Sequence, residues 1–233
     1  MALKRRGSGR PVVHLALLLA TAFTLSACGK PARTPEEVAQ RVMENSAWVD
    51  EALACPADVM ATEEPLSLDL SPGNCEGKRI GQCLRFCRID HVGACRRLAY
   101  ELEAREQGKA AEIVFQRSCI LGDASGCTNR GAYLKLNKGD DPKIQSCTAR
   151  TFRRACEAKD PWGCTMYGHA FHDGHGEPQD DARARQFYEM GCSLSDSSDD
   201  PACAAARRSI GEMDAKRGEV EAVPVPAGDS TRR

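Results

Sequence analysis

The spacing of the cysteines constrains this chain more than any other feature. Three segments place two cysteines with seven residues between them, beginning at Cys87, Cys119 and Cys156. A fourth, looser copy begins at Cys192 and has ten residues before its second cysteine. The leading cysteines lie 32, 37 and 36 residues apart, a period typical of helical solenoids, in which each repeat contacts only its neighbours. The pattern therefore predicts stacked repeats in place of one central core.

The segments between the cysteines have the spacing of paired helices. We predict helices over 124–137 and 142–158 in one unit, and over 162–172 and 181–193 in the next. Pro142 suits a first helical turn, where an N–H would have no partner. No run alternates apolar and polar residues, so strands find no support. The predicted fold class is all-α: a right-handed solenoid of antiparallel helix pairs stapled by disulfides.

The unit at residues 163–192, "GCTMYGHAFHDGHGEPQDDARARQFYEMGC", resembles the Sel-one-like repeat, a relative of the tetratricopeptide repeat, in its cysteine-rich bacterial form. The likeness is carried by Gly163, Cys164, Gly168, Phe171, Gly174, Gly176, Asp180, Ala184, Tyr188 and Cys192. Two earlier units match less fully, so the resemblance covers roughly residues 80–210. It implies an array of helix pairs that serves as an adaptor between proteins.

The paired cysteines can be placed on such helices. Cys119 lies near the end of one helix, Gly122 can end that helix, and Asp123 can cap the next. Cys127 then falls one turn inside the second helix, where a Cα separation of about 5.5 Å, as a disulfide requires, is expected. The same placement in each unit predicts the disulfides Cys87–Cys95, Cys119–Cys127, Cys156–Cys164 and Cys192–Cys203.

Four further cysteines have no partner defined by the repeat: Cys55, Cys75, Cys83 and Cys147. Four cysteines allow three pairings, and we expect only that Cys83 and Cys147 are buried in the helical array. Zinc ligands usually stand two to four residues apart, and Cys83 and Cys87 alone approach that spacing. A Cys-x-x-Cys redox motif is absent from the sequence.

The first 30 residues indicate export. Basic residues precede an apolar run over 12–25, which is typical of a secretory signal and too short for a membrane span. Leu25-Ser26-Ala27-Cys28 resembles the bacterial lipobox. This implies cleavage before Cys28, diacylglycerol on its sulfur and a further acyl chain such as palmitate. Gly29 replaces the aspartate that retains many lipoproteins at the inner membrane, which favours the outer membrane. In an oxidising envelope the other twelve cysteines can pair.

The chain divides into five predicted segments. Residues 35–54 have helical apolar spacing and, with the loop after them, are expected to cap the N-terminal end of the array. The segments are a signal peptide over 1–27, a lipidated linker over 28–34, the N-terminal helix and loop over 35–78, the repeat solenoid over 79–219, and a disordered tail over 220–233.

Three histidines, His169, His172 and His175, form a candidate metal site. The first two share a predicted helix and the third lies in a glycine-rich loop. They lack the four-apart pair and adjacent glutamate of a zinc hydrolase. Solvent-facing loop histidines are the alternative, and no cofactor is expected.

Two functions follow. The first is a monomeric, membrane-anchored scaffold that binds an envelope protein or peptide. The alternative, a β-lactamase-like or other hydrolase, rests on descriptions of some cysteine-rich members of the resembled family. The chain contains no Ser-x-x-Lys, Lys-Thr-Gly or Ser-Asp-Asn, so the serine mechanism lacks its residues and no catalytic residue is predicted. A net charge of −1 gives no reason to expect nucleic acid.

Overall fold

The computed structural model describes residues 34–61 and 79–221, and within these residues all regular secondary structure is helical. The helices are α1 (Pro35–Met43), α2 (Ser46–Glu51), α3 (Pro56–Val59), α4 (Ile80–Cys87), α5 (Val92–Glu103), α6 (Gly108–Ile120), α7 (Ala124–Lys138), α8 (Pro142–Glu157), α9 (Pro161–Asp173), α10 (Asp181–Leu194) and α11 (Pro201–Glu221). The all-α class is therefore confirmed. The predicted signal peptide, Cys28, Cys75 and the last twelve residues lie outside the described residues.

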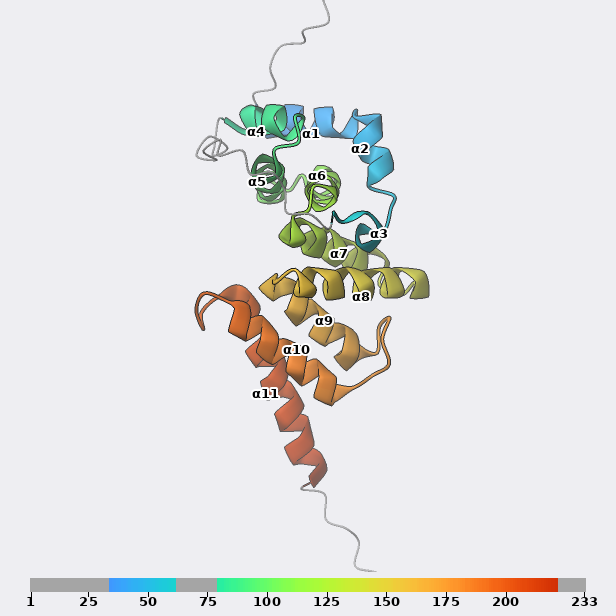
Figure 1. Ribbon diagram of the computed structural model, residues 1–233, viewed down its shortest axis with the longest axis vertical. Coiled ribbons are helices and arrows are strands. Elements are labelled where there is room, and N and C mark those ends of the chain that lie inside the picture. Colours follow the sequence, from blue (N-terminus) through green and yellow to red (C-terminus); the bar gives the residue numbers. More distant parts are fainter. Residues whose placement is uncertain (1–33, 62–78, 222–233) are drawn as a thin grey trace, which may run out of the picture. The chain divides into compact units, whose positions relative to one another are not determined.

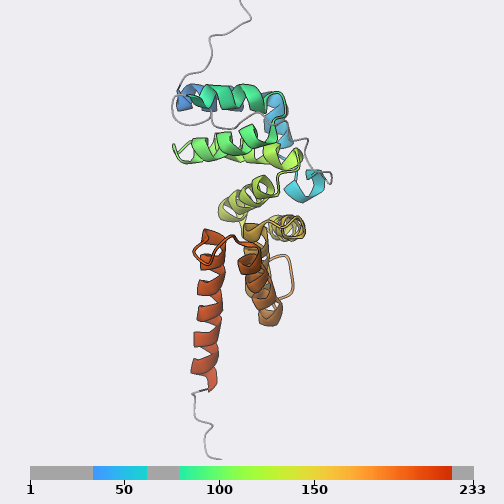
Figure 2. The ribbon, with the colours of Figure 1, turned by 60° about the vertical axis from the view of Figure 1, so that its left-hand side comes forward.

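From α4 onward each helix packs on the next one in the sequence, as the ribbon shows from two directions (Figures 1 and 2). The helix pairs of successive repeats are α5 with α6, α7 with α8, and α9 with α10. The four helices predicted between residues 124 and 193 are observed as α7 to α10, with ends that differ by one residue or none. This sequential packing is the arrangement that a helical repeat predicts.

Local residues define where the helices begin and end. Asp141 and Asp160 accept backbone N–H groups at the starts of α8 and α9, and each is followed by a proline in the first turn. Gly174 ends α9 in the left-handed region with φ of 70°. Asp123 stands at the start of α7 as expected, but its carboxylate does not cap the helix. It accepts the Ser118 hydroxyl at 2.6 Å instead.

Four disulfides join the second helix of one repeat to the first helix of the next. They are Cys87–Cys95, Cys119–Cys127, Cys156–Cys164 and Cys192–Cys203. Their Cα atoms lie 4.2 to 4.6 Å apart, closer than the expected value of about 5.5 Å. Each bond closes a short loop, and a loop of this length contributes about 2.5 kcal/mol in a chain-entropy model. A chain with this many disulfides is compatible with an oxidising, exported location.

The structure also pairs two of the cysteines that the repeat leaves unassigned. Cys55 is joined to Cys147 across 92 positions, with Cα atoms 5.8 Å apart. Cys83 and Cys147 are both buried, and Cys83 is disulfide-bonded as well. Among the disulfides described, Cys55–Cys147 is the one that joins residues far apart in the sequence, because the others span eight or eleven positions.

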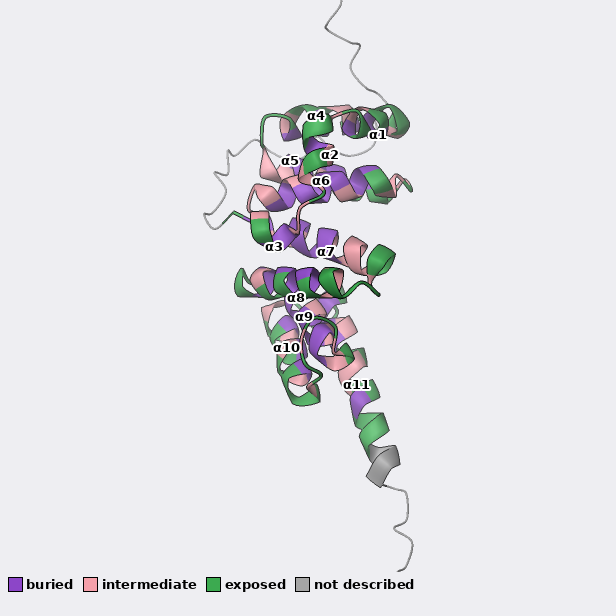
Figure 3. Cartoon of the chain, turned by 90° about the vertical axis from the view of Figure 1, so that its right-hand side faces the viewer, coloured by how far each residue is buried: buried purple, intermediate pink, exposed green. Residues whose placement is uncertain are grey.

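The apolar interior consists of small clusters along the stack. One lies among α1, α2, α4, α5 and α6 and includes Leu98 and Phe115. Another lies among α8 to α11 and includes Phe152, Phe171 and Tyr188. Buried residues line the faces that the helices turn toward their neighbours (Figure 3). Toward its end α11 becomes exposed, and residues 214–217 are all exposed. Each repeat thus contributes to a local core that its neighbours complete.

The N-terminal segment differs from the prediction of one helix that caps the array. Residues 35–54 form two helices, α1 and α2, because Asn45 starts a new helix by accepting the Trp48 N–H, and the short helix α3 follows them. α1 packs on α4 and α6, whereas α3 reaches α6, α7 and α8. The segment therefore runs along the side formed by the second helices of the pairs, and the bond from Cys55 to α8 holds it there.

Candidate functional site

The first helices of the repeats carry one stripe of exposed and partly exposed residues at equivalent positions. Counted from the second cysteine of each unit, the stripe takes the residues two before, two after, five after and nine after it. These positions fall on one helix face. None of the residues at these positions is buried. The stripe comprises Gly93, Arg97, Tyr100 and Ala104 on and after α5, Ser125, Asn129, Ala132 and Leu136 on α7, Trp162, Met166, His169 and Asp173 on α9, and Pro201, Ala205, Arg208 and Glu212 on α11.

Hydrogen bonds join the stripe of α5 to that of α7. The Tyr100 hydroxyl lies 3.0 Å from the Ser125 hydroxyl, and the Asn129 side-chain amide donates to the Tyr100 oxygen at 3.0 Å. The same amide donates to the Ser125 carbonyl at 2.8 Å, which fixes its orientation. Beside the stripe, the Tyr133 hydroxyl donates to Glu103 at 2.9 Å. Adjacent helices thus form one continuous, ordered surface.

A buried carboxylate links α7 to α9 beneath this surface. Asp160 accepts the Thr128 hydroxyl at 2.6 Å and the Gly163 N–H at 2.8 Å. Burial raises the pKa of Asp160, and these two hydrogen bonds oppose that shift. Farther along the same helices, Lys135 pairs with Asp173 at 3.1 Å. The relative position of the two first helices is therefore specified at both ends.

Large apolar side chains are exposed on the stripe. Tyr100 is 38% exposed, Trp162 39% and Leu136 81%. Each belongs to a different first helix, so the apolar surface is distributed along the stack. Exposed aromatic residues beside ordered hydrogen-bonding groups are typical of surfaces that bind proteins.

The stripe differs between repeats at positions where the framework stays the same. Four residues after the second cysteine, every one of the first three repeats has a small residue: Ala99, Gly131 and Gly168. Four residues before the next leading cysteine, each has an aromatic ring: Phe115, Phe152 and Tyr188. By contrast, the stripe position two before the second cysteine holds Gly93, Ser125 and Trp162. The packing residues repeat, whereas the residues of the stripe change.

The opposite side of the array is already covered in part. α2 packs on α6, and α3 packs on α6, α7 and α8. Arg154 on α8 donates to the carbonyls of Ala57 and Met60, the latter at 3.1 Å. The first-helix side is therefore the more open of the two sides for a partner.

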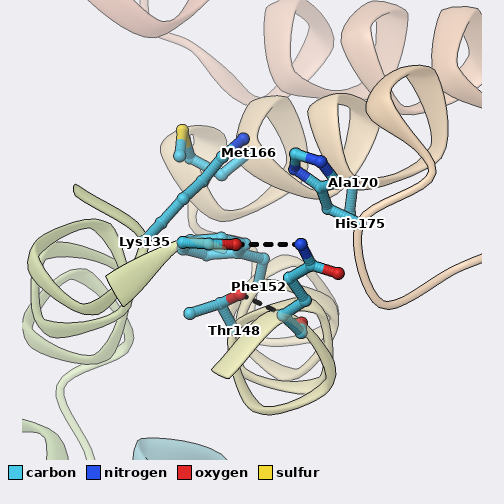
Figure 4. Close-up of a pocket in the computed structure, with 8 residues that line it drawn as sticks. Lys135, Thr148, Phe152, Met166, Ala170 and His175 are labelled. Carbon is cyan, nitrogen blue, oxygen red and sulfur yellow. Dashed lines mark hydrogen bonds between the residues drawn. The ribbon is translucent and has the colours of Figure 1, made fainter. Parts of the chain in front are cut away.

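A small cavity lies among α7, α8, α9 and the loop after α9 (Figure 4). Phe152, Met166 and Ala170 form its apolar part, while Lys135 and His175 lie at its edge. It leaves about 10 Å³ for the centre of a water molecule, the space of a single water. A small-molecule substrate needs a cavity of several hundred Å³, so this cavity serves packing.

The three candidate metal ligands do not converge. The His169 ring nitrogen Nδ1 lies 2.9 Å from the Tyr188 hydroxyl, and His172 lies 2.8 Å from Asp181. His175 instead lines the small cavity. In the residues described, no group of three or more histidine, cysteine, aspartate or glutamate side chains is placed to hold a metal ion. The arrangement of these three histidines therefore does not support a metal site.

Sequence reasoning did not identify the stripe. The sequence does contain the signal for the stripe, because aligning the second cysteines of the repeats also aligns their first helices residue by residue. Exposure could not be assigned to those positions without the packing of α5, α7 and α9. Of the residues singled out in the sequence, the disulfide cysteines are placed at the junctions between repeats, and His169 falls on the stripe.

Neither protein-family models nor curated proteins gave a match when compared with this chain. In the part of the chain that the structure describes, no helix is both long and apolar enough to cross a membrane.

Proposed function

We propose that this protein is a lipid-anchored helical-repeat scaffold of the bacterial envelope, and that it binds a segment of another protein along the first-helix stripe. One observation carries the proposal: the residues of the stripe change from repeat to repeat, while the small and aromatic packing positions stay the same. In such a protein the constant packing residues hold the helices in the same arrangement, and the variable residues of the stripe present specific contacts to a partner.

The lipobox-like sequence before Cys28 supports the anchor. The disulfides support export, because so many disulfides do not persist in a reducing cytosol. The likeness of residues 163–192 to the Sel-one-like repeat supports an adaptor role. The proposed form is a monomer with its anchor in the outer membrane, and the N-terminal segment connects that anchor to the array.

Site-specific photocrosslinking tests the binding face. We compare a photoreactive residue at Leu136, on the stripe, with one at Leu53, which is similarly exposed (83% against 81%) but lies on the covered side. In intact cells, Leu136 should give one discrete adduct that Leu53 does not give. Trp162→Ala should abolish the adduct because it removes an apolar contact of the same face.

Ile89→Ala is the matched control, because Ile89 is exposed but lies off the stripe. It should leave the Leu136 adduct intact. Equal adducts from Leu136 and Leu53, or a Leu136 adduct that survives Trp162→Ala, would contradict binding on this face.

A further inference from the structure

Residues 52–60 lie on the second-helix side as a short strap, which is held by polar contacts to its backbone and by the packing of Met60 against Cys119 and Cys127. The Ala57 N–H donates to the Thr151 hydroxyl at 3.2 Å, and Arg154 donates to the carbonyls of Ala57 and Met60. Arg130 donates to the Ala52 carbonyl at 3.0 Å. Four of these contacts are made to strap backbone atoms, so they are lost together when the strap moves.

The polar groups beside the strap are incompletely satisfied. Nε of Arg130, Nε of Arg117 and Oε2 of Glu51 are buried and have no hydrogen-bond partner among the residues described. Unpartnered buried polar atoms cost free energy, whereas water would satisfy them. Opening this junction would hydrate these atoms.

One covalent bond fastens the strap. Cys55 is partly exposed, and its sulfur is bonded to that of Cys147 on α8. The Arg150 guanidinium lies 3.7 Å from the Cys55 sulfur and also pairs with Asp58 of the strap at 2.5 Å. A positive charge beside a disulfide attracts an incoming thiolate and stabilises the negative charge that develops on sulfur.

The disulfides between repeats have a different environment. Both cysteines are fully buried in Cys87–Cys95 and in Cys119–Cys127. In Cys156–Cys164 both are buried, and only in Cys192–Cys203 is one cysteine partly exposed. Access controls thiol–disulfide exchange. Of the five disulfides whose two cysteines the structure describes, the strap bond and the Cys192–Cys203 bond are therefore the two open to a reductant.

We propose that Cys55–Cys147 is a redox latch, which a thioredoxin-like dithiol protein opens to release the strap from α8. The reductant's thiolate attacks the Cys55 sulfur, the S–S bond breaks, and Cys147 leaves as a thiolate that takes up a proton. The second thiol of the reductant then attacks the mixed disulfide and frees Cys55 as a thiol. The reductant ends as a disulfide, so two electrons and two protons pass to the protein.

Release uncovers polar side chains on α8 and the surface of Cys119 and Cys127 that Met60 covers, while the covalent bonds between repeats remain. Arg150, Thr151 and Arg154 lose their strap partners and face solvent. The bonds between repeats span eight or eleven positions and have no cysteine in the strap. The strap does cover one of them, because the Cys119 sulfur lies 3.7 Å from the Pro56 carbonyl and Met60 packs on Cys119 and Cys127. The latch therefore changes one side of the array without unfolding the helix pairs.

Partial reduction of the exported protein, purified from the envelope in detergent, tests the order of opening. The probe is thioredoxin with its reductase, followed by acid quenching, alkylation and peptide mass spectrometry. Cys55 and Cys147 should be alkylated at least tenfold faster than the cysteines of the four bonds between repeats. Equal or faster labelling of any of those four bonds would overturn the latch.

Hydrogen exchange tests the release itself. In protein reduced only at the latch, and in the Cys55→Ser, Cys147→Ser variant, the amides of Ala57 and Met60 should exchange at least tenfold faster than in the oxidised protein. The Cys192→Ser, Cys203→Ser variant is the matched control and should leave those amides protected. Unchanged protection of the strap after latch reduction, or equal loss of protection in the control, would refute the proposal.

Discussion

The ring of Tyr188 lies directly against Gly168, so closely that a β-carbon on Gly168 would come within 2.7 Å of two ring carbons. Gly168 is on α9 and Tyr188 is on α10, and their contact sets how near the two helices of the pair approach. Gly131 and Phe152 repeat the relationship between α7 and α8, where the same β-carbon would meet the ring at 2.8 Å. Close helix contact at a glycine therefore recurs in two of the repeats, and the first repeat has the small residue Ala99 at the same position.

Gly168→Ala should destabilise the protein. The added methyl group must displace a buried ring, and overpacking of this kind costs about 1–3 kcal/mol, which outweighs the gain of about 1 kcal/mol in helix propensity. We expect a lower midpoint of urea unfolding. Gly211→Ala is the control: nothing lies within 4 Å of its β-carbon, so the same change should raise stability by up to about 1 kcal/mol. A Gly168→Ala protein as stable as the wild type would contradict the close contact.

Substitution of Asp160 should separate hydrogen bonding from charge. Asp160→Ala removes the acceptor of the Gly163 N–H and the Thr128 hydroxyl, and loss of such a cap costs about 1 kcal/mol. Asp160→Asn keeps an acceptor oxygen and removes a charge whose burial raises the pKa. We expect Asp160→Asn to be at least as stable at pH 7 as the wild type. Chemical denaturation measures both variants, and an asparagine variant as unstable as the alanine variant would argue against this account.

His169 should make the protein less stable in mild acid. Burial, followed by the charge of Lys135, lowers the pKa of His169 in the folded state. As the pH falls through the unfolded-state value of about 6.5, the unfolded chain binds a proton that the folded chain does not, and stability falls. Burial also raises the pKa of Tyr188 to about 12, so its hydroxyl stays protonated and can donate to the neutral His169 ring.

The measurement compares unfolding free energies at pH 7.5 and pH 5.5. His169→Gln should show a smaller loss of stability than the wild type over this interval. His175→Gln, at an exposed position in the loop after α9, should behave like the wild type. Identical pH dependence in the wild type and His169→Gln would remove His169 as the cause.

Cys28→Ala should release the protein from the membrane. The substitution removes the sulfur that the proposed lipid requires, and each buried CH₂ of an acyl chain contributes about 0.8 kcal/mol to membrane binding. Labelling with radioactive palmitate should mark the wild type and not the variant, and alkaline washing should leave only the wild type in the membrane fraction. Ala27→Gly is the control and keeps a small residue before the cysteine. Unchanged labelling and retention of Cys28→Ala would rule out this anchor.

Much of the fold could be predicted because its signals are local. The helix caps, the helix end at Gly122 and the paired cysteines each depend on residues within about ten positions of one another in the chain. The helices α7 to α10 and the junctions between repeats could therefore be located from the sequence. The cap at Asp123 was predicted wrongly in one respect. Ser118 and Arg96 compete for its carboxylate, and their positions depend on the packing of α5 and α6.

The stripe and the strap could not be predicted in the same way. The sequence by itself determined the helical repeat and the bonds between its units, because each of those contacts joins residues close in the chain and recurs with the same period. Only the tertiary structure decided that Cys55 meets Cys147, that residues 52–60 lie on α8, and that Tyr100 contacts Ser125 and Asn129. Such contacts join segments that have no periodic relation, or depend on how neighbouring helices are oriented, and both become defined only when the helices pack.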